Sequence, residues 1–270
     1  MLKKINLNNL ISYSRNKIYN SIASVGLEKK IIDKVANSKE VLEKIGNKAD
    51  GNKDIEIIFK DGYKIICPIK NIEAVAETCI NEDYTGTFYQ IKSGDVIFDL
   101  GANIGSFSVY AAHKGAQVFA FEPDPYNLKY ISKNIEINNL QDKITVYASA
   151  VAEKIGTVRL SSNDNHACGS IINAEGTTGS IEVPTTTIDT VISEAGIEKI
   201  SLFKIDVEGA EYLILPSIST ANYAKIEKII GEFHLFNSTP DLNFKKIKQT
   251  LQPYFSKIKH KIPYYFTASK

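Results

Sequence analysis

The 270-residue chain carries 32 basic and 31 acidic side chains, and 43% of its residues are apolar. This near-neutral balance is typical of an ordinary globular protein and gives no composition-level support for nucleic-acid binding. Its three cysteines lack the spacing of a metal site or a disulfide framework, and no apolar run reaches about 18 residues, so we expect a cytoplasmic protein without a transmembrane helix.

Residues 1–80 are predicted to form a helical and β-hairpin extension, and residues 81–270 a separate domain. Apolar residues at helical spacing from residue 7 to 25, with basic side chains between them, predict a basic amphipathic helix. Such a helix either packs on its own domain or contacts a membrane surface or a partner protein. A second helix is expected at 28–45, followed by a hairpin around Asp61-Gly62.

A glycine-punctuated stretch at residues 95–112 is the centre of the functional prediction. The apolar run 96–100 contains Asp99 and leads into Gly101 and Gly105, and a helical apolar pattern follows. This order predicts a strand, a tight turn and a helix. Glycine permits positive φ and close approach of a ligand, and the free N–H groups at a helix start attract electron-rich groups. The turn is therefore a predicted ligand site.

Glu122 ends a second apolar run, 118–121, and lies 21 positions after Gly101. An acid about 20 residues after the glycine turn of a nucleotide-binding unit is placed to accept both ribose hydroxyls. The Gly-x-x-x-Gly spacing does not meet the Gly-x-Gly-x-x-Gly fingerprint of NAD-binding folds. With Asp99 two residues before Gly101, the acid-x-Gly pattern instead resembles class I S-adenosylmethionine (SAM) methyltransferases.

The rest of the chain alternates predicted strands and helices. Strands are expected near 144–147, 157–160, 180–183, 201–206 and 226–234, helices near 126–138, 188–195, 210–217 and 242–251, and a last strand pair near 255–258 and 264–267. This alternation predicts an α/β, Rossmann-like, doubly wound and mostly parallel sheet with an antiparallel edge hairpin. The polar stretch 161–178 is expected to be a long functional loop.

Charged side chains at the ends of the fourth and fifth predicted strands form a second constellation. Lys204 and Asp206 share one face of a strand that should be buried, and Glu208 follows in the loop. Glu232 and His234 share a face at the end of the next strand. Because ligands bind beyond the carboxyl ends of such strands, these residues are candidates for the chemistry.

Three interpretations of this constellation stay open. In the first, His234 or an acid removes a proton from the attacking hydroxyl as general base. In the second, Asp206, Glu232 and His234 hold a divalent metal such as Mg²⁺, which lowers the pKa of the hydroxyl. In the third, Lys204 and the carboxylates form an ion-pair network that only orders the loops.

Four motifs, in this order, resemble the FkbM family of SAM-dependent methyltransferases over about residues 80–240. They are Asp99–Gly105, Phe121–Pro125, Val183–Asp189 and Lys204–Glu211. The resemblance implies a class I methyltransferase sheet and methyl transfer to an oxygen of a sugar, glycan or secondary metabolite. Residues 1–80 have no clear counterpart in it.

By the same resemblance, three turns would bind SAM. The implied contacts are Asp99, Gly101, Ala102, Asn103 and Gly105 at the methionine part, Glu122 and Pro123 at the ribose, and Ser149 near the adenine. The predicted catalytic residues are Asp206, His234, Lys204 and Glu208, with Asp206 and His234 as the first candidates. Acceptor contacts are expected from the loop at 161–178.

Two other functions compete with this prediction. An RNA methyltransferase is disfavoured by the charge balance and because Asp206–Gly209 stands where the Asn/Asp-Pro-Pro-Tyr/Phe motif of base amino-group methylation would lie. A non-catalytic SAM-binding module could instead dock a glycan-assembly enzyme through the basic N-terminal helix. SAM turnover separates this module from an enzyme.

Overall fold

The computed structural model describes residues 25–46, 51–162, 179–234, 240–261 and 264–270. The chain divides into two compact units, residues 1–82 and 83–270. The basic helix expected at 7–25 and the loop expected at 161–178 fall almost entirely outside the described residues, so their contacts stay predictions. Within the described ranges, no helix is long and apolar enough to cross a membrane.

The first unit combines helices with a β-hairpin. Its elements are α2 (Val25–Lys34), α3 (Ser38–Gly46), β1 (Asp54–Ile58), β2 (Lys64–Pro68), η1 (Ile69–Asn71), α4 (Ile72–Val75) and η2 (Ala76–Ile80). The hairpin predicted around Asp61-Gly62 is confirmed, since β1 and β2 pair antiparallel. Gly62 adopts a φ of 104°, which the tight turn requires.

The single helix expected at 28–45 is wrong, because α2 and α3 are separate helices. At the break, the Ala36 N–H donates to the Ile58 carbonyl at 2.7 Å. The Asn37 side-chain oxygen accepts a hydrogen bond from the Ile58 N–H at 2.9 Å. The break is therefore tied to the edge of β1, and this tertiary pairing overrides the helical periodicity.

The second unit is built on a seven-stranded sheet. Its strands are β3 (Val96–Leu100), β4 (Gln117–Phe121), β5 (Ile144–Tyr147), β9 (Leu202–Ile205), β10 (Lys228–Glu232), β11 (Lys257–Lys261) and β12 (Tyr265–Ser269), in the order β11-β12-β10-β9-β3-β4-β5. Among the described strands of this sheet, only the pairings of β12 are antiparallel. The predicted α/β Rossmann-like sheet with an antiparallel edge is thus confirmed.

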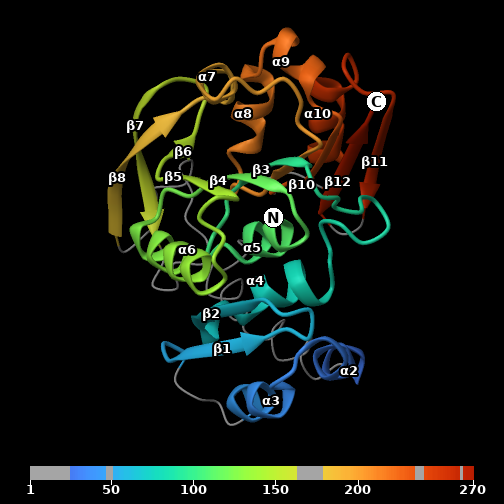
Figure 1. Ribbon diagram of the computed structural model, residues 1–270. Helices are drawn as coiled ribbons and strands as arrows, with labels where there is room; N and C mark the ends of the chain where they lie inside the picture. Colours follow the sequence, from blue (N-terminus) through green and yellow to red (C-terminus); the bar gives the residue numbers. More distant parts are fainter. Residues whose placement is uncertain (1–24, 47–50, 163–178, 235–239, 262–263) are drawn as a thin grey trace, which may run out of the picture. The chain divides into compact units, whose positions relative to one another are not determined.

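A second sheet and a set of helices complete this unit. The sheet has the order β6-β8-β7, formed by β6 (Ala150–Val151), β7 (Gly156–Ser162) and β8 (Gly179–Thr186). The helices are α5 (Ser106–His113), α6 (Pro125–Ile137), α7 (Ile188–Glu194), α8 (Glu211–Ser217), α9 (Thr220–Lys225) and α10 (Pro240–Leu251). Helices α5 and α6 cover one face of the large sheet, and α7, α8 and α10 cover the other (Figure 1).

Strand alternation decides which side chains face which helices. Phe98 and Leu100 of β3 belong to the apolar cluster formed with α7, α8 and α10. Asp99 lies between them in sequence and therefore faces α5, where its carboxylate accepts a hydrogen bond from Ser108 at 2.6 Å. By the same alternation Lys204 of β9 faces α5. The charged residues of β3 and β9 thus lie on the same side of the sheet.

Helix α9 was not expected from the sequence. The Ser219 hydroxyl caps it by accepting from the Asn222 N–H at 3.4 Å. The Asp189 carboxylate holds the same turn, because it accepts from the Ser219 N–H at 3.2 Å and from the Asn222 amide at 2.8 Å. The acid that ends the Val183–Asp189 motif therefore anchors the chain before β10.

Candidate active site

The glycine turn after β3 lies against the loop after β9. Gly101 adopts a φ of 76°, and a Cβ built on it would lie 1.8 Å from the Asp206 carbonyl oxygen. Only glycine fits this contact. Because β3 lies between β4 and β9, the strand order reverses at this point, which is where open α/β sheets bind ligands. The two predicted constellations are therefore neighbours.

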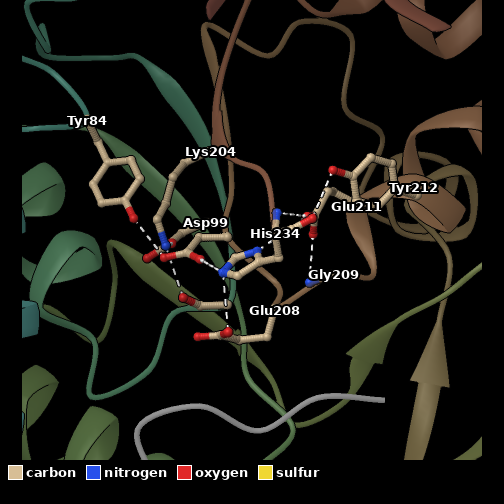
Figure 2. Close-up of polar contacts among 10 residues, drawn as sticks. Tyr84, Asp99, Lys204, Glu208, Gly209, Glu211, Tyr212 and His234 are labelled. Atoms are coloured by element: carbon tan, nitrogen blue, oxygen red, sulfur yellow. Dashed lines mark hydrogen bonds and ion pairs between the residues drawn. The ribbon is translucent and has the colours of Figure 1, made fainter. Parts of the chain in front are cut away.

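A buried ion pair lies directly under the turn (Figure 2). Asp99 and Lys204 are direct partners across β3 and β9. The Lys204 Nζ lies 2.9 Å from the Asp99 Oδ1, with exposed fractions of only 4% and 0%. The ammonium also donates to the Gly101 carbonyl at 3.0 Å. The partner of Lys204 is thus Asp99, which the sequence analysis did not anticipate.

The charge of Lys204 is maintained by its surroundings. Burial by itself lowers the pKa of Lys204, but the negative charges of Asp99, Asp206 and Glu122 outweigh burial and raise it. The ammonium is therefore a fixed positive charge beneath the turn. Because the Lys204 ammonium donates to Asp99 and to the Gly101 carbonyl, we assign it to holding the turn in place.

Glu122 ends β4 beside the same turn. Its carboxylate is buried and accepts hydrogen bonds from the Asn103 N–H at 2.8 Å and the Asp124 N–H at 2.9 Å. Burial raises the pKa of Glu122 to about 7, although these hydrogen bonds act in the opposite direction. A ligand that donates to this carboxylate would favour its ionised form.

His234 is the centre of a carboxylate cluster beyond β9 and β10 (Figure 2). Its Nδ1 lies 3.3 Å from the Glu211 Oε1, and its backbone N–H donates to the same oxygen at 2.7 Å. Its Nε2 lies 3.2 Å from the Glu208 Oε2 and 3.9 Å from the Asp206 Oδ1. The imidazole is thus held on one nitrogen and faces two carboxylates with the other.

These neighbours decide the protonation state of His234. Burial by itself lowers its pKa, but the Glu211 hydrogen bond and the charges of Glu208, Glu211 and Asp206 raise it to about 10. The ring is therefore an imidazolium near neutral pH. A protonated ring cannot accept a proton, so in this arrangement a carboxylate is the better proton acceptor.

Asp206 and Glu208 present their carboxylates differently. The Asp206 side chain is 25% exposed, and its Oδ2 accepts a hydrogen bond from the Tyr84 hydroxyl at 2.7 Å. Glu208 is 31% exposed and has a φ of 51°, a conformation that is uncommon for a non-glycine residue. Such backbone strain is typical of functional sites.

The metal interpretation has a geometric basis. Single ligand atoms of Asp206, Glu232 and His234 all lie within 4.8 Å of one another, and all three side chains are partly exposed. Carboxylate and imidazole are suitable ligands for several divalent ions. The three residues predicted from the sequence thus lie close together, and their binding of a metal stays a prediction.

The remaining predicted SAM contacts lie around the same edge. Ala102 is buried, and its N–H donates to the Phe121 carbonyl at 3.0 Å. Asn103 has a φ of 55°, and Pro123 and Ser149 are partly exposed after β4 and β5. Their contacts with a cofactor stay predictions.

The sequence analysis did not predict the contacts of two residues at this site, Glu211 and Tyr84. Glu211 is fully buried, and its Oε2 also accepts from the Gly209 N–H at 2.9 Å, so it joins the loop after β9 to the end of β10. The only sequence signal was its place in the Lys204–Glu211 motif. Tyr84 stands in the segment before β3, and no sequence signal pointed to its contact with Asp206.

The family model described as "Methyltransferase FkbM domain" matches residues 99–257, more than half of the chain. This chain belongs to the FkbM methyltransferase family. It is therefore a SAM-dependent methyltransferase, and the matched segment includes both the glycine turn and the His234 cluster.

Related proteins place this FkbM methyltransferase among enzymes with different acceptors. The 31-O-demethyl-FK506 methyltransferase FkbM of Streptomyces tacrolimicus is 28% identical over 177 residues, which cover 54% of this chain and 67% of that protein. The hexuronic acid methyltransferase AglP of Haloferax volcanii is 26% identical over 145 residues, covering 54% of this chain and 58% of that protein. Methyltransferase FkbM from Methylobacillus flagellatus aligns over 75% of this chain and 54% of its own, with 17% identity and a TM-score of 0.48.

Proposed function

We propose that this FkbM methyltransferase transfers the methyl group of SAM to a hydroxyl of a sugar, glycan or secondary metabolite. The observation that carries the proposal is the contact between the Gly101 turn and the loop that bears Asp206 and Glu208, with His234 beside it. The names of the two curated relatives, one for 31-O-demethyl-FK506 and one for hexuronic acid, support an acceptor of this kind.

The residues of the glycine turn fit a SAM molecule. Gly101 and Asn103 have positive φ values, which make the turn after β3 a tight one, and Glu122 stands at the end of the next strand, where a ribose would lie. SAM supplies an electrophilic methyl group on a sulfonium. We assign Asp99 and Lys204 to holding the turn from below rather than to direct contact, because they are engaged with each other.

The chain has two tasks in the transfer, which are alignment of the acceptor hydroxyl and removal of its proton. Asp206 is our candidate for the proton acceptor, and Glu208 is the second candidate. His234, held by Glu211, contributes a positive charge that offsets the surrounding carboxylates. It would also stabilise negative charge that develops on the acceptor oxygen.

A divalent metal at Asp206, Glu232 and His234 is the alternative way to activate the hydroxyl. The metal and a proton would compete for the Nε2 of His234, because a ligating imidazole must be neutral. Metal binding should therefore release a proton near neutral pH. The two schemes are mutually exclusive at this atom.

The proposal is tested by calorimetric titration of SAM, followed by methyl-transfer assays. We expect SAM binding with a micromolar Kd, and transfer from labelled SAM to members of a panel of hexoses, hexuronic acids and glycans. Repeating both with EDTA and with added Mg²⁺ tests the metal scheme. Binding without transfer to any acceptor would favour a non-catalytic module, and transfer to an RNA in the panel would favour the RNA alternative.

The pH dependence of SAM binding is a separate prediction that depends on Glu122. If ribose hydroxyls donate to this carboxylate, SAM binds the ionised form, so binding below the pKa of about 7 must expel a proton. The Kd should therefore rise as the pH falls below 7, approaching about tenfold per pH unit. Calorimetry between pH 5.5 and 8.5 measures this slope.

Two variants control that measurement. Glu122→Gln should bind SAM more weakly at pH 8. Its Kd should not rise below pH 7 in the same way, because the amide does not titrate. Glu136→Gln removes a carboxylate that is exposed on α6 and should behave like the wild type. An unchanged slope in Glu122→Gln would show that another group is responsible.

A further inference from the structure

Tyr84 is held from several sides beside the site. It is 2% exposed. Its ring lies edge-on to Phe107, with centroids 6.0 Å apart, and to Tyr265, with centroids 5.5 Å apart. The Lys204 Nζ lies 5.0 Å from the centre of the same ring. A ring packed in this way has little rotational freedom, so the direction of its hydroxyl is fixed.

The hydroxyl is aimed at one oxygen of Asp206. It donates to Oδ2 at 2.7 Å, which leaves Oδ1 toward the His234 Nε2 at 3.9 Å. Asp206 follows the end of β9 and is partly exposed, so the strand itself does not fix its carboxylate. Tyr84 therefore determines which carboxylate oxygen of Asp206 is left for other partners.

We propose that Tyr84 is the positioning residue for Asp206, an inference that rests on the proposed function. With Oδ2 engaged by Tyr84, Oδ1 is the oxygen assigned to take the acceptor proton, and it lies 3.9 Å from the His234 Nε2. Without the hydroxyl, this hydrogen bond no longer restrains the rotation of the Asp206 carboxylate about its Cβ–Cγ bond. The acceptor would then meet a carboxylate in several orientations, and only some of them are productive.

The test is Tyr84→Phe, which keeps the ring packing and removes only the hydroxyl. We expect kcat to fall by roughly ten- to hundredfold, the range expected for a hydrogen bond to a charged group, while SAM affinity and the acceptor KM change little. Tyr89→Phe is the matched control, because Tyr89 donates to Asp95 at the same 2.7 Å from the same segment. It should keep the wild-type kcat.

A structural readout separates this inference from the proposed function. Crystal structures of the wild type and of Tyr84→Phe should show the Asp206 carboxylate rotated from its wild-type orientation in the variant only, whatever the acceptor is. An unchanged Asp206 carboxylate, or a kcat in Tyr84→Phe equal to that in Tyr89→Phe, overturns the inference. If no acceptor is methylated by the wild type, the proposed function fails, and the two crystal structures still decide the role of Tyr84.

Discussion

Replacing Lys204 with methionine is expected to lower the free energy of unfolding by about 3–5 kcal/mol, because the Asp99 carboxylate would be left buried without its counter-charge. Methionine has a similar length and fills the space of the lysine stem, so the loss reports the charge rather than a cavity. Urea denaturation followed by circular dichroism measures the change.

The double variant Asp99→Asn with Lys204→Met provides the decisive comparison. It removes both charges, so it should be more stable than Lys204→Met alone. Lys199→Met is the surface control. The Lys199 Nζ lies 3.0 Å from a Glu227 carboxylate oxygen, but the two side chains are 63% and 48% exposed. This pair should contribute at most about 1 kcal/mol to the free energy of unfolding. Equal losses in Lys204→Met and Lys199→Met would contradict the central role of the buried pair.

Replacing Asp206 with asparagine is expected to reduce kcat by about 10²–10⁴-fold, the usual contribution of a positioned general base. The amide keeps the shape of the side chain and can still contact Tyr84, so SAM affinity should remain near that of the wild type. Glu122→Ala should show the opposite pattern, with weaker SAM binding as its main defect. Steady-state kinetics with the acceptor from the panel, together with SAM calorimetry, measure both.

Glu232→Gln distinguishes the two ways in which Asp206 could act. If Asp206 accepts the proton directly, Glu232→Gln keeps most of the activity. If both residues bind a metal, the two variants lose activity together and lose the response to Mg²⁺. A parallel loss of SAM affinity and turnover in Asp206→Asn would contradict the division of roles between Asp206 and Glu122.

The sequence predicted the sheet well because its strands are short apolar runs bounded by turn residues. It also predicted that Asp206, Glu232 and His234 would converge, since strand ends meet at one edge of a parallel sheet. The motif residues near Gly101 could be recognised because glycine spacing is a local property. These predictions need only periodicity and chain order.

The partners of the charged residues could not be predicted in the same way. The pairing of Asp99 with Lys204 depends on the register of two strands that lie about 100 residues apart in the chain, and sequence alone does not give register. The break between α2 and α3 at Asn37 could not be predicted either. It depends on a hydrogen bond between the Asn37 side chain and β1, which lies elsewhere in the sequence. The protonation of His234 likewise follows from Glu211, whose contact is tertiary.

The ion pair across β3 and β9 also affects how the protein fluctuates. These two strands cannot separate locally without bringing two charges out of a paired, buried state, which makes partial opening at the centre of the sheet costly. Local unfolding should therefore begin elsewhere in the sheet. The contact between β3 and β9 can persist while the partly exposed carboxylates beyond the strand ends rearrange. Lys204, which is rigid, and Glu208, which is adaptable, therefore lie only four positions apart in the chain.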